Sequence, residues 1–129
     1  MIDNNAKFCK YCKNTANYSI KKVFCTGAEI LIIILNNEKT FKVKFNFFEE
    51  INLLNFIEMN QTGFNYGLIG VISNLGGTDI NDHFIAFCKN PITREWYKYD
   101  DSIVTPVDNF KSEIIDSVMP NILFYEKKK

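Results

Sequence analysis

The stretch that decides the fold is residues 83–100, which read HFIAFCKNPITREWYKYD. It holds two short runs rich in aromatic and β-branched residues, 83–88 and 95–100, and such runs favour β-strands. The Asn-Pro pair between the two runs is a turn signal. We therefore predict a β-hairpin whose loop is the four-residue segment 90–93.

The register of this hairpin gives the first functional hypothesis. Counting outward from the loop places Phe87 opposite Trp96 and His83 opposite Asp100. Directly opposed Cβ atoms lie about 4.5–5.5 Å apart, so the imidazole is expected to hydrogen-bond to the carboxylate. A histidine held by a carboxylate is the general base and its orienting group in nucleophilic hydrolases. His83 is also the only histidine in the chain.

Composition bounds the class of protein. The 129 residues suffice for one domain with a real core, and 47% apolar with 15% aromatic residues indicates a β-rich globular chain. Basic and acidic residues number 15 each, which gives no pull toward nucleic acid. The longest apolar run, 30–35, is too short to cross a membrane. We expect neither nucleic acid nor membrane as a partner.

The cysteines and the N-terminus indicate a compartment. The first five residues, MIDNN, are mostly polar and do not resemble a secretory signal. Four cysteines without a secretory context favour free or metal-bound thiols over a disulfide framework. The expected localisation is intracellular, either cytoplasmic or nuclear.

Around the hairpin, the pattern predicts further strands and one helix. Strands are expected at 18–24, 28–35, 40–47, 64–73, 102–107 and 122–126. The run 28–35 is typical of a strand buried on both faces, while 49–59 is ambiguous between helix and strand. Asp108-Asn109 is expected to cap a helix over 110–118 that Pro120 ends. The predicted class is α+β on an antiparallel sheet.

From Tyr66 onward the sequence resembles the second half of the catalytic domain of the ubiquitin-specific protease family, a family of cysteine deubiquitinases. The elements that carry the resemblance are 66–72 (YGLIGVI), 82–89 (DHFIAFCK), 96–104 (WYKYDDSIV) and 122–126 (ILFYE). The resemblance implies the antiparallel-sheet palm of a papain-like cysteine protease, with only its C-terminal half in this chain.

The resemblance extends more loosely toward the N-terminus and implies how the chain is organised. Residues 1–129 would be a partial ubiquitin-specific protease domain. Within it, 8–25 looks like a remnant of the family's zinc-ribbon knuckle with its link, and 28–129 looks like the palm with the histidine and aspartate elements.

Roles carry over to matching positions. His83 matches the family's general base, Asp100 its orienting acid, and Asp101 the neighbouring acid that assists or substitutes in some members. Asp101 reads equally well as a turn residue leading into Ser102. The resemblance implies the C-terminal part of a thiol-dependent deubiquitinase that cleaves isopeptide bonds at the ubiquitin C-terminus. Its partners would be ubiquitin and ubiquitinated proteins.

The family's nucleophile, which lies in a Gly-Asn-x-Cys box, has no counterpart here. Cys25 and Cys88 read as small buried hydrophobes. The chain is therefore expected to supply the histidine and the aspartate but not the cysteine, and to be inactive without a missing N-terminal half. The alternative is a non-catalytic ubiquitin-binding pseudo-enzyme or an inactive truncated fragment. Asp82, where the family carries glycine, and Asn74, where it carries histidine, favour that alternative.

Cys9 and Cys12 have the spacing of half a tetrahedral zinc site. Cys25 could offer a third ligand, but a fourth is not evident. We expect no cofactor in the chain by itself, with zinc bound only if ligands come from missing upstream sequence.

Overall fold

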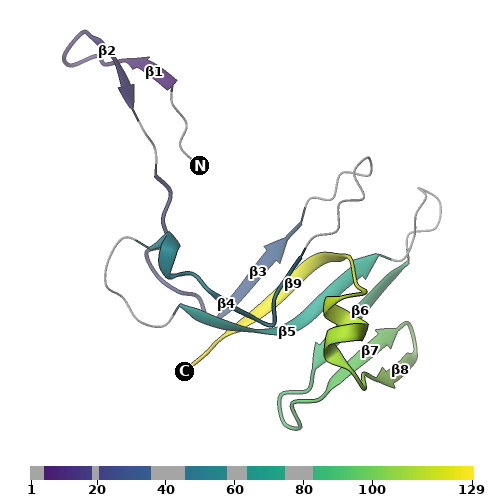
Figure 1. The fold of residues 1–129 in the computed structure, drawn as a ribbon. Helices are drawn as coiled ribbons and strands as arrows, with labels where there is room; N and C mark the ends of the chain where they lie inside the picture. The colour runs from purple at the N-terminus through teal and green to yellow at the C-terminus, as the bar shows by residue number, and fades with distance from the viewer. Residues whose placement is uncertain (1–4, 19–20, 36–45, 58–63, 75–82) are drawn as a thin grey trace.

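A computed structural model describes residues 5–18, 21–35, 46–57, 64–74 and 83–129 (Figure 1). The strands are β1 (Asn5–Phe8), β2 (Thr15–Tyr18), β3 (Ile30–Ile34), β4 (Glu50–Asn52), β5 (Asn65–Asn74), β6 (Phe84–Lys89), β7 (Trp96–Asp100), β8 (Ile103–Pro106) and β9 (Pro120–Lys127). Two short helical segments are η1 (Leu54–Phe56) and η2 (Lys111–Ile115). None of the helices in these ranges is long and apolar enough to cross a membrane.

Seven of the strands form one antiparallel sheet in the order β3-β9-β5-β6-β7-β8, with β4 also paired to β5. The last strand, β9, thus lies inside the sheet, between β3 and β5 (Figure 1). Strands β1 and β2 form a separate two-stranded hairpin. The expected α+β class on an antiparallel sheet is confirmed, while the division at 8–25 and 28–129 stays a prediction.

One side of the sheet, called here the covered face, carries the core. Neighbouring strands place a continuous row of side chains on it, and the side chain of Leu123 in its middle is 1% exposed. The row runs from β3 to β7 through Ile33, Leu123, Val71, Phe87 and Lys98. Because side chains alternate between the faces of a strand, Ile85 and Trp96 share this face and are also buried.

The opposite side, called here the open face, is also apolar but remains exposed. Ile32 is 53% exposed and Phe84 is 54% exposed. The register of neighbouring strands places Ile34, Tyr99 and Val104 in one row across this face. All three are exposed. Within the described part of the chain, no segment covers this face in the way that η2 covers part of the other.

The cover on the core side comes partly from η2, which lies over β6 and β7 (Figure 1). Asn109 begins the segment by a reciprocal cap: its Oδ1 accepts from Ser112 N (3.1 Å), and its own N–H donates to Glu113 Oε1 (2.7 Å). Phe110 then stacks on Trp96, with ring centroids 4.9 Å apart. The expected cap is confirmed, but the helix is only five residues long instead of spanning 110–118.

The short segment is also wound more widely than an α-helix. Asp116 N–H donates to the Lys111 carbonyl five residues back instead of four. The last strand then begins at Pro120, two residues earlier than predicted.

Several other expectations need correction. The strand predicted at 18–24 is wrong over 21–23, which form no strand, and Phe24 forms only an isolated bridge with Ile57. Within the run 28–35, β3 covers 30–34; among the described residues it pairs only with β9, and its side chains alternate between exposed and partly buried. The ambiguous segment 49–59 contains β4 and η1. Most of the strand predicted at 40–47 lies outside the described residues.

The central hairpin is confirmed, but its predicted register is wrong by two residues. Lys89 pairs with Trp96 and Ala86 with Tyr99, so the loop spans six residues, 90–95. The loop is longer because Asn90 Oδ1 accepts from the N–H groups of two residues within it. Arg94 then takes a left-handed conformation with φ 63° before β7 starts.

Candidate active site

The structure brings His83 and Asp100 together. His83 Nε2 lies 2.6 Å from Asp100 Oδ1 across the β6–β7 hairpin. In the observed register the two residues are diagonal neighbours instead of directly opposite, and long side chains reach across that diagonal. The expected juxtaposition survives the register error because a shift of two residues keeps every side chain on its face.

The electrostatics of the pair follow from this contact. The hydrogen bond to Asp100 is the largest cause that raises the pKa of His83, and partial burial opposes it. The same bond, followed by a bond from Lys98, lowers the pKa of Asp100. The side chains are 41% and 29% exposed, so solvent screens the pair. The imidazole therefore bonds an ionised carboxylate, which fixes the orientation of its ring.

The ring geometry leaves one nitrogen for chemistry. With Nε2 directed at Asp100, Nδ1 lies on the other side of the imidazole ring. A carboxylate that accepts from Nε2–H favours the tautomer in which Nδ1 carries the lone pair. Such an Nδ1 is suited to accept a proton from a nucleophile.

Asp101 lies beside the pair in the tight turn between β7 and β8. Its backbone is left-handed, with φ 52°, and its side chain is exposed. Candidate ligand atoms of His83, Asp100 and Asp101 all lie within 4.8 Å of one another. Asp101 also raises the pKa of His83 through its charge, after the contributions of Asp100. The position suits both an assisting acid and a turn residue.

Lys98 is the site residue that the sequence analysis missed. Its Nζ lies 3.0 Å from Asp100 Oδ2, the carboxylate oxygen that does not face His83. The sequence did contain a signal for Lys98: it lies two residues before Asp100, and residues two apart on a strand share a face.

The expectation that Cys25 and Cys88 are buried is wrong, because both are exposed. Cys88 pairs with Tyr97 and with Gly70 on the open face, away from His83. Partial burial of its thiol still raises the pKa of Cys88, so the thiolate is disfavoured. Cys88 therefore does not face the imidazole.

Cys9 and Cys12 lie in the turn that joins β1 to β2. Hydrogen bonds to the Cys9 sulfur, first from the backbone of Cys12 and then from Tyr11, lower the pKa of Cys9. Cys9 also accepts from Lys13 N at its carbonyl. The turn thus presents two thiols suited to a metal, which is half of a tetrahedral shell. Among the residues that the structure describes, Cys25 does not join them in a group of three ligands.

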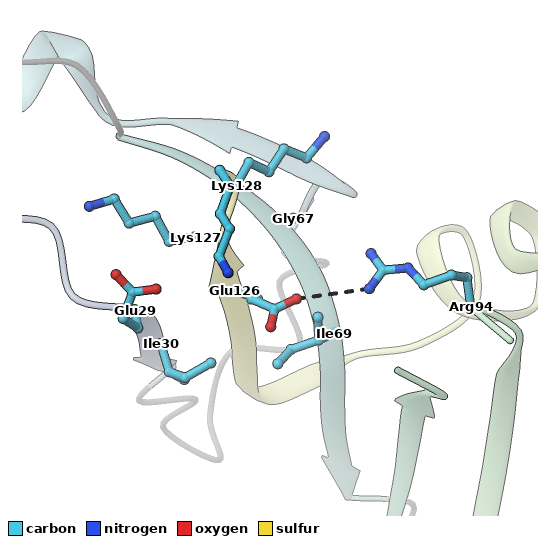
Figure 2. Close-up of a pocket in the computed structure, with 9 residues that line it drawn as sticks. Glu29, Ile30, Gly67, Ile69, Arg94, Glu126, Lys127 and Lys128 are labelled. Atoms are coloured by element: carbon cyan, nitrogen blue, oxygen red, sulfur yellow. Dashed lines mark ion pairs between the residues drawn. The ribbon is translucent and has the colours of Figure 1, made fainter. Parts of the chain in front are cut away.

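A hollow of about 400 Å³ opens beside β5 and β9, with Arg94 of the β6–β7 loop at its edge (Figure 2). It contains both signs of charge. Arg94 pairs with Glu126 at 3.9 Å, and Lys128 pairs with Glu50 outside the hollow. Its lining holds four basic side chains and two acidic ones, and two of the basic ones, Arg94 and Lys128, already pair with carboxylates, so the His83–Asp100 pair remains the candidate centre.

An antiparallel sheet with a histidine and an aspartate at one end defines the class: part of a domain of papain-like fold. Solved structures agree. The SAGA Ubp8/Sgf11/Sus1/Sgf73 DUB module bound to ubiquitin aldehyde matches with a TM-score of 0.71 at 21% identity, covering all of this chain and 31% of that one. A Ubp8(C146A) module bound to monoubiquitin gives a TM-score of 0.74 at 20% identity and covers 30% of that chain.

The family follows from sequence. The model of the family described as "Ubiquitin carboxyl-terminal hydrolase" matches residues 5–125, and the chain belongs to that family. Rat ubiquitin carboxyl-terminal hydrolase 2 is 35% identical over 77 residues, which are 60% of this chain and 12% of that protein. Chicken ubiquitin carboxyl-terminal hydrolase 48 is 26% identical over 120 residues, 86% of this chain and 12% of that protein. The chain thus spans about an eighth of these curated relatives.

Proposed function

We propose that this chain supplies the general base and the orienting acid of a thiol-dependent deubiquitinase, with the nucleophilic cysteine coming from polypeptide outside these 129 residues. The observation that carries the proposal is the 2.6 Å contact between His83 Nε2 and Asp100 Oδ1. This contact leaves Nδ1 as the ring nitrogen that can accept a proton. Family membership supports ubiquitin as the partner, together with ubiquitinated proteins.

In the proposed reaction, His83 Nδ1 accepts the proton of the cysteine thiol. The thiolate attacks the carbonyl carbon of ubiquitin's terminal glycine, and the isopeptide C–N bond breaks as the imidazolium protonates the leaving lysine amine. His83 then removes a proton from water, which attacks the thioester and releases the ubiquitin carboxylate and the thiol. Asp100 holds the ring orientation throughout and stabilises the imidazolium.

The experiment is a chimera. The segment of rat ubiquitin carboxyl-terminal hydrolase 2 that matches this chain is replaced by this chain's own residues, and cleavage of a fluorogenic amide at the ubiquitin C-terminus is measured. We expect turnover by the chimera that falls at least about a hundredfold in the His83→Gln variant. Asp100→Asn should fall less, and Lys89→Met, on the same face but at the far end of β6, should match the parent.

The opposing outcomes are clear. A folded chimera that binds ubiquitin without cleaving it would favour the non-catalytic binding module, and turnover independent of His83 would contradict the proposal. The 129-residue chain alone should show no turnover, because neither Cys25 nor Cys88 faces the imidazole.

Two further proposals concern metal and compartment. The thiols of Cys9 and Cys12 would hold zinc only together with two ligands from outside the chain, where the metal would close the knuckle as a structural site. Finding one zinc per isolated chain after dialysis against a chelator would contradict this. The four cysteines are free in the structure, which supports a reducing location, cytoplasmic or nuclear.

A further inference from the structure

The carboxylate of Asp100 has two partners, one on each oxygen. His83 Nε2 lies 2.6 Å from Oδ1, and Lys98 Nζ lies 3.0 Å from Oδ2. Two donors on opposite oxygens restrict the rotation of the carboxylate about its last bond. A carboxylate with only one donor could still rotate about that bond, and the imidazole that it orients would then change its orientation too.

The sheet fixes where Lys98 begins. Lys98 lies two residues before Asp100 on β7, so both side chains leave the covered face. Directly across the strand pair is the buried Phe87, so the stem of the lysine leaves the sheet beside a residue of the core. The lysine stem is thereby placed by the core, while the ammonium group reaches the carboxylate at the sheet's end.

The surroundings explain why the ammonium turns to Asp100. Lys98 also lines a hollow of about 560 Å³ between the sheet and η2, and Glu113 is the other charged residue of that lining. Glu113 Oε1 accepts the N–H of Asn109 at 2.7 Å, in the cap that begins η2. Glu113 is thus engaged in the cap, whereas Lys98 forms its ion pair with Oδ2 of Asp100 at 3.0 Å.

We propose that Lys98 is a positioning residue of this site: it holds Oδ2 of Asp100, which fixes the carboxylate that orients His83 and limits the negative charge that reaches the imidazole. The inference rests on the proposed function, because it assigns a further member to the same site.

Each described charge near His83 either raises or lowers the pKa of the imidazole. Asp100 raises the pKa of His83 most, Asp101 raises it further through its charge, and Lys98 lowers it. Asp79 and Asp82 belong to the segment 75–82, outside the described residues. Lys98 is the one cation in this described set, so its removal leaves two acids acting on the imidazole.

The test is an NMR titration of His83 in the full 129-residue chain without a histidine tag. Because His83 is the only histidine, its ring ¹H–¹³C signals need no assignment. In Lys98→Met we expect the titration midpoint to rise by several tenths of a pH unit, the scale expected for one nearby partly screened charge. Lys98→Arg, which retains the charge and the donors, should stay close to wild type.

The matched control is Lys89→Met. Lys89 leaves the same face from β6, forms an ion pair with Glu49 at 3.6 Å, and lies at the other end of the strand from His83. Its midpoint should equal that of wild type. A second readout is the pair of ring ¹⁵N shifts, which report the tautomer. We expect the preference for Nε2–H to weaken in Lys98→Met.

A midpoint in Lys98→Met that equals or falls below wild type, with the tautomer unchanged, overturns the proposal. If the methionine variant loses its dispersed amide spectrum, Lys98→Gln supplies the same comparison with a polar tip. The titration needs no turnover, so this result is separate from that of the chimera: inactivity there would refute the catalytic role and leave the measured role of Lys98 intact.

Discussion

The two faces of the sheet have similar chemistry but different environments. On the covered face, Leu123 and Val71 are almost fully buried, and at the end of this face His83 meets Asp100. On the open face, Ile32 and Phe84 remain more than half exposed although they belong to the same strands or their neighbours. The comparison teaches that strand pairing alone places side chains, while burial depends on what lies above the sheet.

The largest expected difference between the faces is in stability. Leu123→Ala should lower the free energy of unfolding by about 2–5 kcal/mol, because it removes buried methyl groups and leaves a cavity. Ile32→Ala removes a side chain of similar size from the open face and should cost less than about 1 kcal/mol. Urea denaturation of both variants measures the difference, and equal losses would show that the open face is buried in solution.

The next effect concerns the exposed apolar surface itself. Phe84→Lys should reduce binding of the dye ANS and raise solubility several-fold, because it places a charge within the open face. Ile92→Lys, in the hairpin loop outside the sheet, is the control, since Ile92 is exposed but away from this face. Equal dye binding by the wild type and both variants would argue against a continuous open face.

A smaller effect is expected from pH at the end of the covered face. The folded pKa of His83 is raised, so its contribution to stability is full below the unfolded histidine pKa and is lost as the pH rises through the folded pKa. The Asp100 pKa is lowered, so its contribution is lost only in acid. The melting temperature of wild type minus that of His83→Gln should therefore shrink from about pH 5.5 to pH 8.5.

The control for this titration is Lys89→Met, whose melting temperature should follow wild type across the same range. A difference between wild type and His83→Gln that grows with rising pH would contradict the pairing of His83 with an ionised Asp100.

The smallest expected effect is in thiol chemistry. Backbone hydrogen bonds lower the pKa of Cys9, whereas partial burial raises the pKa of Cys88. In variants that keep a single cysteine, Cys9 should therefore react several-fold faster with a maleimide at neutral pH. Faster labelling of Cys88 would show that its exposure on the open face affects the labelling rate more than its thiolate fraction does.

The sequence predicted the His83–Asp100 contact for two reasons. The alternation of side chains along each strand assigned both residues to one face, and the short loop allowed few pairings between the two strands. It failed on the register, because the side chain of Asn90 and the left-handed backbone of Arg94 lengthen the loop, and such local bonds leave no periodic signal. The two-residue error preserved the faces, so the candidate site was still identified.

The exposure of Cys88 was missed for a different reason. Cysteine is usually a small buried residue, but its exposure here depends on the open face, which lacks cover among the described residues. Lys98 was missed because a single lysine in a strand gives no indication of which carboxylate oxygen it will contact.

The position of β9 inside the sheet has a consequence for synthesis on the ribosome. Among the described residues, β3 pairs only with β9, and Ile34 pairs with Ile122, which is translated roughly ninety residues later. At about 5–20 residues per second, β9 is therefore completed at least several seconds after β3. During that interval the five consecutive aliphatic side chains of 30–34 lack their pairing with β9. The order of strands thus sets when, as well as how, this sheet closes.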